Sequence, residues 1–392
     1  MLRRFVAKSF KSLQEVEIEL GQVNVLVGAN GSGKSNFLEA LGVAGAAAAG
    51  RVDDEALLRR GVRPGAPKLY KASFSGERLR PSIRFEAANG EAAYGIEILN
   101  ESDDGPWRFK SEVLHENGLK LVGRGPADKA QTLDTSAGLV ALEAVRLRPG
   151  SPASSLLQRL RDFAIYAPNT PSLRGLIPDP QSREPVGLHG GRLASAVEDL
   201  KRLAAGKTEF EDVVDDLLDL MEWVTDFGAK PSGQVPMSAS IPTTNKVVYF
   251  RDRFMARGRN ELTAYDASEG ALYALFAAAV TTHVNAPKLL AIDNVDAGLN
   301  PRLARRLMEK ICAWTLRQPE KQILLTSHNP LVLDGLPLQD DRVRLFVADR
   351  SDQGKTQITR VSISPDLMQK AKEGWPLSRL WVQGHFGGVP NI

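Results

Sequence analysis

The residues best suited to chemistry lie near the start of the chain, in a glycine-rich loop that ends in lysine and serine. The stretch Gly28-Ala29-Asn30-Gly31-Ser32-Gly33-Lys34-Ser35 has the GxxxxGK[ST] spacing of a phosphate-binding loop. Its glycines permit backbone angles that aim successive N–H groups inward, while the lysine would reach the β- and γ-phosphates and the serine would bind Mg²⁺. The candidate contacts for a nucleoside triphosphate are Gly28, Asn30, Gly31, Ser32, Gly33, Lys34, Ser35 and Asn36.

The flanking segments match the context that this loop requires. Residues 23–27 form a short β-branched run, and residues 36–41 carry the pattern of a helix. Strand, glycine-rich loop and helix in this order distinguish a phosphate-binding loop from a chance match. The alternative is a glycine-rich turn without a ligand, which the complete set of fixed positions disfavours.

Two later strands end in side chains that fit the same site. Residues 288–292 form an apolar run that ends in Asp293, the form of a Walker B strand, and the carboxylate would bind Mg²⁺ together with Ser35. Residues 322–327 form a second apolar strand, which ends in His328. A neutral imidazole at that position can hydrogen-bond a γ-phosphate or the attacking water.

A further anion site is predicted at the start of a helix that runs to Val280. Ser268 is a typical N-cap residue, and with Gly270 it would present a hydroxyl and free N–H groups at the helix N-terminus. The alternative is an ordinary capped helix without a ligand.

Taken together, these motifs resemble those of ABC-type ATPases, in the branch that contains the RecF, SMC and OLD-like proteins. The phosphate loop, the Ser268-Glu269-Gly270 signature, the strand before Asp293, Gly298-Leu299-Asn300-Pro301 and Thr326-Ser327-His328-Asn329-Pro330 follow in the family order. The resemblance implies that ATP and Mg²⁺ are the cofactors and that the protein forms a homodimer or a higher even oligomer. In that dimer, Ser268 of one protomer would cap the γ-phosphate held by Lys34 of the other.

The chain departs from the family pattern at the catalytic carboxylate. The family usually has glutamate directly after the Walker B aspartate, but here that residue is Asn294, which cannot accept a proton as a carboxylate does. Asp296 is the nearest substitute, so the candidate catalytic residues are Asp296, His328 and Asn294. OLD relatives also carry a C-terminal Toprim nuclease, and the residues after His328 lack its carboxylate cluster beyond Asp340-Asp341.

The predicted fold class is α/β, an ABC-ATPase head with an antiparallel β subdomain and an inserted helical lobe. Residues 3–10, 15–20 and 68–122 alternate as antiparallel strands do, whereas residues 193–224 have helical periodicity. We expect a first ATPase lobe at 1–168, a helical lobe with the signature at 169–285, and the rest of the ATPase lobe at 286–392. Residues 191–194 and 380–390 also resemble stretches of OLD-like ATPases.

Composition is typical of a soluble globular protein, with a net charge of +3 and a single cysteine. We expect a cytoplasmic protein without a membrane partner, because no signal peptide is evident and residues 271–280 are too short to span a bilayer. One segment, 51–71, is basic and could be a solvated loop or a nucleic-acid contact. Its basic residues are Arg51, Arg59, Arg60, Arg63, Lys68 and Lys71.

The resemblance therefore implies an ATPase that dimerises on ATP and controls a separately encoded effector, such as a nuclease. Stand-alone ATPases of this type resemble the ATPase subunits of anti-phage defence systems such as Septu and PARIS. Two alternatives stay open: a slow-turnover nucleotide switch that acts as a scaffold, motivated by Asn294, and a DNA-repair ATPase that clamps DNA through Arg59 and Arg60.

Overall fold

The described strands form three sheets, two of six strands and one of three. The structure is a computed structural model. It describes residues 1–100, 102, 104–125, 134–143, 146–238, 240–242, 244–362 and 375–387.

A mostly parallel sheet carries the predicted site at one of its edges. Its strand order is β15-β14-β3-β13-β12-β8, and β15 alone among these described strands runs antiparallel to its neighbour. The strands are β3 (Val23–Val27), β8 (Ala164–Tyr166), β12 (Leu289–Ile292), β13 (Gln322–Ser327), β14 (Val343–Arg350) and β15 (Thr356–Arg360). Parallel strands end at the same edge of a sheet, so the loop after β3, Asp293 and His328 come together there.

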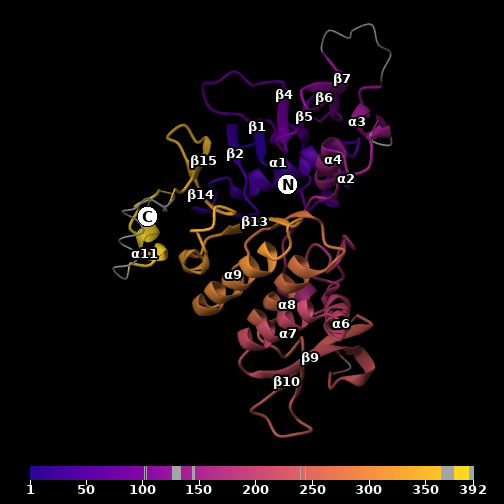
Figure 1. The fold of residues 1–392 in the computed structure, drawn as a ribbon, viewed down its shortest axis with the longest axis vertical. Helices are drawn as coiled ribbons and strands as arrows, with labels where there is room; N and C mark the ends of the chain where they lie inside the picture. Colours follow the sequence, from indigo (N-terminus) through magenta and orange to yellow (C-terminus); the bar gives the residue numbers. More distant parts are fainter. Residues whose placement is uncertain are drawn as a thin grey trace.

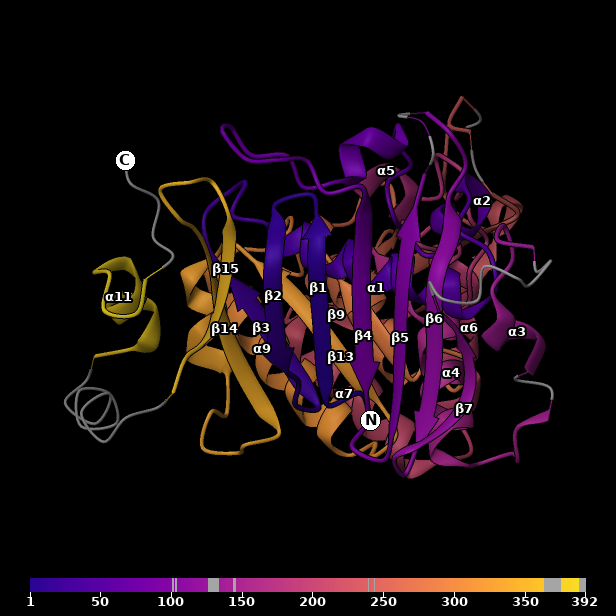
Figure 2. The ribbon, with the colours of Figure 1, turned by 90° about the horizontal axis from the view of Figure 1, so that it is seen from above.

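A second sheet is antiparallel throughout and has the strand order β2-β1-β4-β5-β6-β7 (Figure 2). Its strands are β1 (Arg4–Phe10), β2 (Leu13–Glu19), β4 (Ser82–Ala88), β5 (Ala92–Leu99), β6 (Arg108–Glu116) and β7 (Leu119–Arg124). Every second side chain of β4 and β5, such as Phe85 and Tyr94, is buried, which is the pattern of a sheet with one solvated face. The predicted antiparallel subdomain is confirmed.

Helix α1 (Lys34–Ala48) packs against strands of both sheets. Thirteen of its fifteen residues are buried, because it has protein on all sides. Its small residues permit this packing: a Cβ at Gly42 would lie 2.3 Å from Val62 Cγ2, and one at Gly45 would lie 2.3 Å from the Leu160 carbonyl. The shorter elements on this side are α2 (Asp54–Leu58), η1 (Pro67–Tyr70), α3 (Leu139–Glu143) and α4 (Pro152–Asp162).

Helices cover the opposite face of the parallel sheet (Figure 1). They are α5 (Thr170–Leu173), α6 (Leu193–Ala204), α7 (Thr208–Leu220), α8 (Glu269–Thr282) and α9 (Pro301–Leu316), followed by η4 (Pro330–Gly335) and α11 (Leu377–Val382). Alternate residues of β3 and β12 face this helical core and the core around α1, which explains why both strands are apolar throughout. Among the described helices, none combines the length and apolarity that a bilayer crossing needs.

The segment expected to form a helical lobe is only partly helical. The helical pattern of 193–224 forms two helices, because the chain is extended at Lys207, and β9 already begins at Val224. The segment also contains a three-stranded antiparallel sheet that the sequence analysis missed (Figure 1). Its strands are β9 (Val224–Pro231), β10 (Lys246–Asp252) and β11 (Glu261–Thr263), with η3 (Ser232–Gln234) between the first two. Residues 388–390 of the OLD-like C-terminal stretch lie outside the described residues.

Candidate active site

The glycine-rich loop between β3 and α1 has the conformation that a phosphate-binding loop requires. Gly28, Gly31 and Gly33 have φ values of 151°, 78° and 106°, in the region that favours glycine. A Cβ at Gly28 would lie 2.1 Å from the Ala348 carbonyl, and one at Gly33 would lie 2.1 Å from Thr356 Oγ1. Helix α1 begins directly after Gly33, so its free N–H groups face the loop.

The ammonium of Lys34 lies inside this loop. Its Nζ donates to the carbonyls of Gly28 and Ala29 at 2.8 and 2.9 Å. Burial lowers the pKa of Lys34 to about 8, while the carboxylates of Asp293 and Asp296 act in the opposite direction. A lysine that is 4% exposed and surrounded mainly by neutral carbonyls is well placed to bind an anion.

Asp293 joins the end of β12 to the loop. The Ser35 hydroxyl donates to the Asp293 carboxylate, with distances of 2.9 and 3.1 Å to its two oxygens. The Thr326 hydroxyl also donates to Asp293, and the Asp293 backbone N–H donates to Tyr166 in β8. The serine and the aspartate that the sequence assigned to Mg²⁺ are therefore in direct contact.

His328 lies on the other side of the lysine. Its Nδ1 is 3.2 Å from Lys34 Nζ and 3.3 Å from the Gly28 carbonyl. Burial and the Lys34 charge lower the pKa of His328, so the ring is neutral at pH 7 and its Nδ1 can accept from the ammonium. In that tautomer the proton is on Nε2.

The residues after Asp293 hold the second candidate carboxylate. Asn294 is exposed, adopts a left-handed φ of 55°, and donates its backbone N–H to Thr326 Oγ1 at 2.8 Å. The Asp296 carboxylate is close enough to Lys34 and His328 to raise the pKa of both groups. Its Oδ1 is buried and has no hydrogen-bond partner in the part of the chain that the structure describes.

These residues fit ATP and Mg²⁺. Ser32 Oγ, inside the loop, is buried without a hydrogen-bond partner among the described side chains and backbone groups, as is Asp296 Oδ1. Such atoms need a ligand or a water molecule as a partner. Mg²⁺ is usually held by one or two protein oxygens together with substrate phosphates and waters. Ser35 and Asp293 supply such oxygens, and no cluster of three or more acidic, histidine or cysteine side chains suited to a metal occurs among the described residues.

The predicted signature, Ser268-Glu269-Gly270, lies at the start of α8. Ser268 is exposed and directly precedes α8, but its side chain does not cap the helix. Gly270 packs closely against Leu303, because a Cβ added at Gly270 would lie 2.7 Å from Leu303 Cδ2. Gly298 lies beside Glu269, because a Cβ added at Gly298 would lie 3.2 Å from Glu269 Oε2. The signature is therefore adjacent to the loop at Gly298, and its contact with a second protomer stays a prediction.

A hairpin far along the chain contributes residues that the sequence analysis missed. Thr356 in β15 donates its hydroxyl to the Ser32 carbonyl at 2.8 Å, and its Oγ1 lies 2.7 Å from Ser12 Oγ. Arg350, at the end of β14, donates to the Gly31 carbonyl at 2.9 Å, and Asn36 donates to Ser12. Neither Thr356 nor Arg350 lies in a recognisable motif, so no sequence signal identifies them.

Residues 167–169 connect β8 to α5. Asn169, the last residue of this connection, accepts a hydrogen bond from the Ser172 backbone N–H at the start of α5. The Tyr273 hydroxyl of α8 donates to the Pro168 carbonyl at 3.2 Å. This segment therefore links the helical side of the molecule to the edge of the sheet that carries the site.

The fold and the motifs at the sheet edge define an ABC-type ATPase of the RecF and SMC branch. The chain belongs to the family described as "AAA domain, putative AbiEii toxin, Type IV TA system", whose model matches residues 23–334.

Two curated relatives are DNA replication and repair proteins RecF. The one from Halothermothrix orenii is 33% identical over 142 residues, which cover 34% of this chain and 36% of the relative. The one from Magnetococcus marinus is 27% identical over 143 residues, which cover 34% and 35%. The chain therefore spans about a third of the length of the curated relatives it matches.

Solved SMC heads share the fold at low sequence identity. An SMC head bound to the C-terminal winged-helix domain of ScpA has a TM-score of 0.51 and 13% identity, and the match covers 94% of this chain and 99% of that one. An SMC head with an extended coiled coil, bound to the C-terminal domain of ScpA derived from Pyrococcus furiosus, gives 0.50 and 13%, over 95% and 98%.

Proposed function

We propose that this protein hydrolyses ATP and uses ATP-dependent dimerisation to control a separately encoded effector. The observation that carries the proposal is the contact of Ser35 with Asp293 beside the buried Lys34, with Asp296 Oδ1 nearby and without a partner among the described residues. Bound ATP supplies the phosphoanhydride bond that is cleaved, and Mg²⁺ neutralises its charge. Lys34 and the loop N–H groups bind the phosphates, Ser35 and Asp293 hold the cation, and His328 hydrogen-bonds the γ-phosphate side of the site.

Asp296 is the proposed general base, because Asn294 carries a neutral amide. Replacing Asp296 by alanine is expected to lower kcat by about 100-fold or more and to leave the KM for ATP nearly unchanged, since a general base acts in the transition state. Phosphate release is measured with excess Mg²⁺, and Asp341→Ala, an exposed carboxylate, is the matched control. Robust turnover in the Asp296→Ala variant would assign the base elsewhere. ATP binding without turnover in the intact chain would instead favour the scaffold alternative.

The dimer proposal assigns half of each site to the second protomer. The Lys34→Ala and Ser268→Tyr variants are each expected to be inactive alone. Mixed in equal amounts they should recover about a quarter of the wild-type ATPase rate, because half of the dimers then contain one intact composite site. The rate is measured after the two proteins have exchanged subunits, with size-exclusion chromatography in ATP as a readout of dimer formation. A mixture that stays inactive while hybrid dimers form would contradict the assignment of Ser268.

The effector is proposed to be a second protein, for example a nuclease in anti-phage defence. Two observations support a docked partner: the family description includes a putative toxin, and an SMC head of this fold binds a domain of ScpA. ATP bound across two protomers would stabilise the closed dimer, so an effector that prefers one state would respond to ATP. Purification of the tagged protein with and without ATP, followed by identification of bound chains and nucleic acid, tests this.

The RecF relatives favour a second candidate, an ATPase that clamps DNA directly. Of the two arginines proposed to contact DNA, Arg60 is not accessible, because it is 5% exposed and donates to the backbone carbonyls of Ala56 and Arg161. Arg59 is exposed, so Arg59→Ala is the informative variant for salt-dependent DNA affinity. The absence of DNA binding at low salt would end this alternative.

A further inference from the structure

A cavity of about 300 Å³ lies far along the parallel strands from the ATP site. It is bordered by α7, by the C-terminal ends of α8 and α9, and by the residues that precede β12 and β13. The opposite ends of β12 and β13 carry Asp293 and His328, so the cavity does not belong to the nucleotide site. Its apolar lining consists of Phe210, Val213, Val284, Ala286 and Trp314. Val284 is 64% exposed, which marks an apolar entrance.

The cavity is also lined by a lysine that has no counter-ion among the described residues. Lys321, just before β13, is 5% exposed, and its Nζ makes one long hydrogen bond of 3.4 Å to the Pro287 carbonyl. No ion pair of Lys321 occurs among the described residues. Burial alone lowers the pKa of Lys321 to about 8, without a compensating carboxylate. The Lys321 ammonium therefore has one long hydrogen bond and no ion pair among the described residues.

The other charged and titratable groups around the cavity are already paired or lie in solvent. They are Glu209 on α7, His283 after α8, Lys288 before β12, and Arg317 and Glu320 after α9. Glu320 binds Arg159 at 2.8 Å and Lys288 at 3.2 Å, while Arg317 binds Asp212. His283 lies 3.6 Å from Asp199, and Glu209 is exposed. Lys321 is thus the cation in this cavity that a ligand would have to neutralise.

We propose that the cavity binds a small apolar carboxylate, with its anionic group on Lys321 Nζ and its hydrocarbon body against Phe210, Val213 and Trp314. A single unpaired ammonium is matched by a monoanion, because a phosphate with two charges would leave one of them buried. A volume of about 300 Å³ lies at the lower end of pockets that bind small molecules, which favours a short chain or a single ring. The proposal does not depend on ATP binding or hydrolysis.

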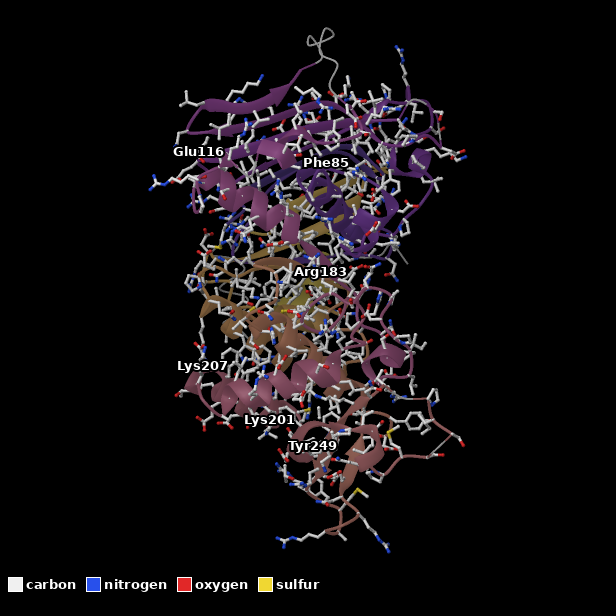
Figure 3. The ribbon with its side chains drawn as sticks, turned by 90° about the vertical axis from the view of Figure 1, so that its right-hand side faces the viewer. Phe85, Glu116, Arg183, Lys201, Lys207 and Tyr249 are labelled. Atoms are coloured by element: carbon white, nitrogen blue, oxygen red, sulfur yellow. The ribbon has the colours of Figure 1, made fainter. Side chains whose placement is uncertain are left out.

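Isothermal titration with three probes of equal length tests the charge preference: octanoate, octanol and octylamine. We expect octanoate to bind the full-length protein more tightly than octanol, and octylamine to bind weakest. Replacing Lys321 by methionine, which keeps the length of the side chain, should weaken octanoate binding at least tenfold and leave octanol unchanged. Lys201 lies on α6 (Figure 3) and is not among the residues that line the cavity, so Lys201→Met should behave like the wild type.

A second variant and a pH series distinguish this cavity from unspecific adsorption. Val213→Trp should fill the space and abolish binding of octanoate and octanol alike. Octanoate affinity should fall as the pH rises above 8, because binding then requires the Lys321 amine to take up a proton. The proposal fails if octylamine binds as tightly as octanoate, if Lys321→Met retains octanoate binding, or if Val213→Trp still binds. Loss of ATPase activity in Lys34→Ala should leave octanoate binding intact.

Discussion

Replacing Lys34 by alanine is expected to weaken Mg²⁺-ATP binding by about 100-fold or more without unfolding the protein. The Lys34 ammonium is 4% exposed and lies within a loop whose carbonyls surround it, so a bound polyphosphate would interact with it away from bulk water. Truncating one partner of a buried, hydrogen-bonded charge pair typically costs about 2–5 kcal/mol of binding free energy. The residual affinity should come from the loop N–H groups and from the cation held at Ser35 and Asp293.

Titration with a fluorescent ATP analogue measures this loss, and circular dichroism shows whether the fold is retained. Lys230→Ala, a half-buried lysine in β9 that pairs with Glu261, is the matched control and should bind ATP normally. Because burial penalises the Lys34 charge, the alanine variant should not unfold at a lower temperature than the wild type in the absence of nucleotide. Unchanged ATP affinity in Lys34→Ala would remove the central assignment of the site.

The second large effect is a gain of stability. Replacing Lys321 by methionine is expected to raise the free energy of unfolding at pH 7 by about 3 kcal/mol. The pKa of Lys321 is about 8 in the folded chain, against 10.5 for an ordinary lysine, so the unfolded chain holds this proton more tightly. That difference corresponds to about 3 kcal/mol of destabilisation, which is fully present below pH 8.

The sign of the pH dependence follows from these two pKa values. Between pH 8 and about 10.5 the folded chain releases the Lys321 proton before the unfolded chain does. The free energy of unfolding of the wild type therefore rises with pH in this range, and the destabilisation by the Lys321 charge disappears. The advantage of Lys321→Met should therefore be large in urea unfolding at pH 7 and small at pH 10. Lys288→Met, an exposed lysine at the rim, should give a change below about 1 kcal/mol at both pH values. An equal gain at both pH values would show that packing, and not charge, explains the effect.

A buried charge such as Lys321, which has no ion-pair partner in the described part of the chain, is expected at a functional position. Most sites of this chain obey local rules, since apolar strands are buried and helices are capped by Ser151, Asn169 or Asn300. Lys321 breaks those rules in a cavity that solvent can enter. The stability measurement and the octanoate titration therefore test the same residue independently.

The local part of the site could be predicted from sequence because each of its elements has a strong local signal. The glycines before Lys34 require unusual backbone angles, and the apolar runs before Asp293 and His328 are typical of buried parallel strands. The rule that parallel strands end at one edge was then enough to bring these side chains together. The antiparallel sheet of the first lobe was predictable for a similar reason, because alternation in β4 and β5 is regular.

Other features depended on contacts between distant segments. Thr356 and Arg350 support the phosphate loop because β14 pairs with β3, which is a tertiary pairing without a local pattern. The three-stranded sheet was missed because β11 has only three residues, and the strands around it are interrupted by polar and glycine-rich turns. The sequence analysis gave only helical periodicity over 193–224 and no boundary between α6 and α7. Periodicity reports burial, and it does not report where backbone hydrogen bonds are interrupted.

The position of β3 in the parallel sheet has a consequence for the order in which the chain can fold during synthesis. β3 is made early, but its two neighbours are β13 and β14, which come from residues 322–350. A ribosome must therefore complete most of the chain before the strand that precedes the phosphate loop is paired on either side. The antiparallel sheet of residues 4–124 pairs only with itself and can form long before that. Nucleotide binding should consequently be acquired late in synthesis.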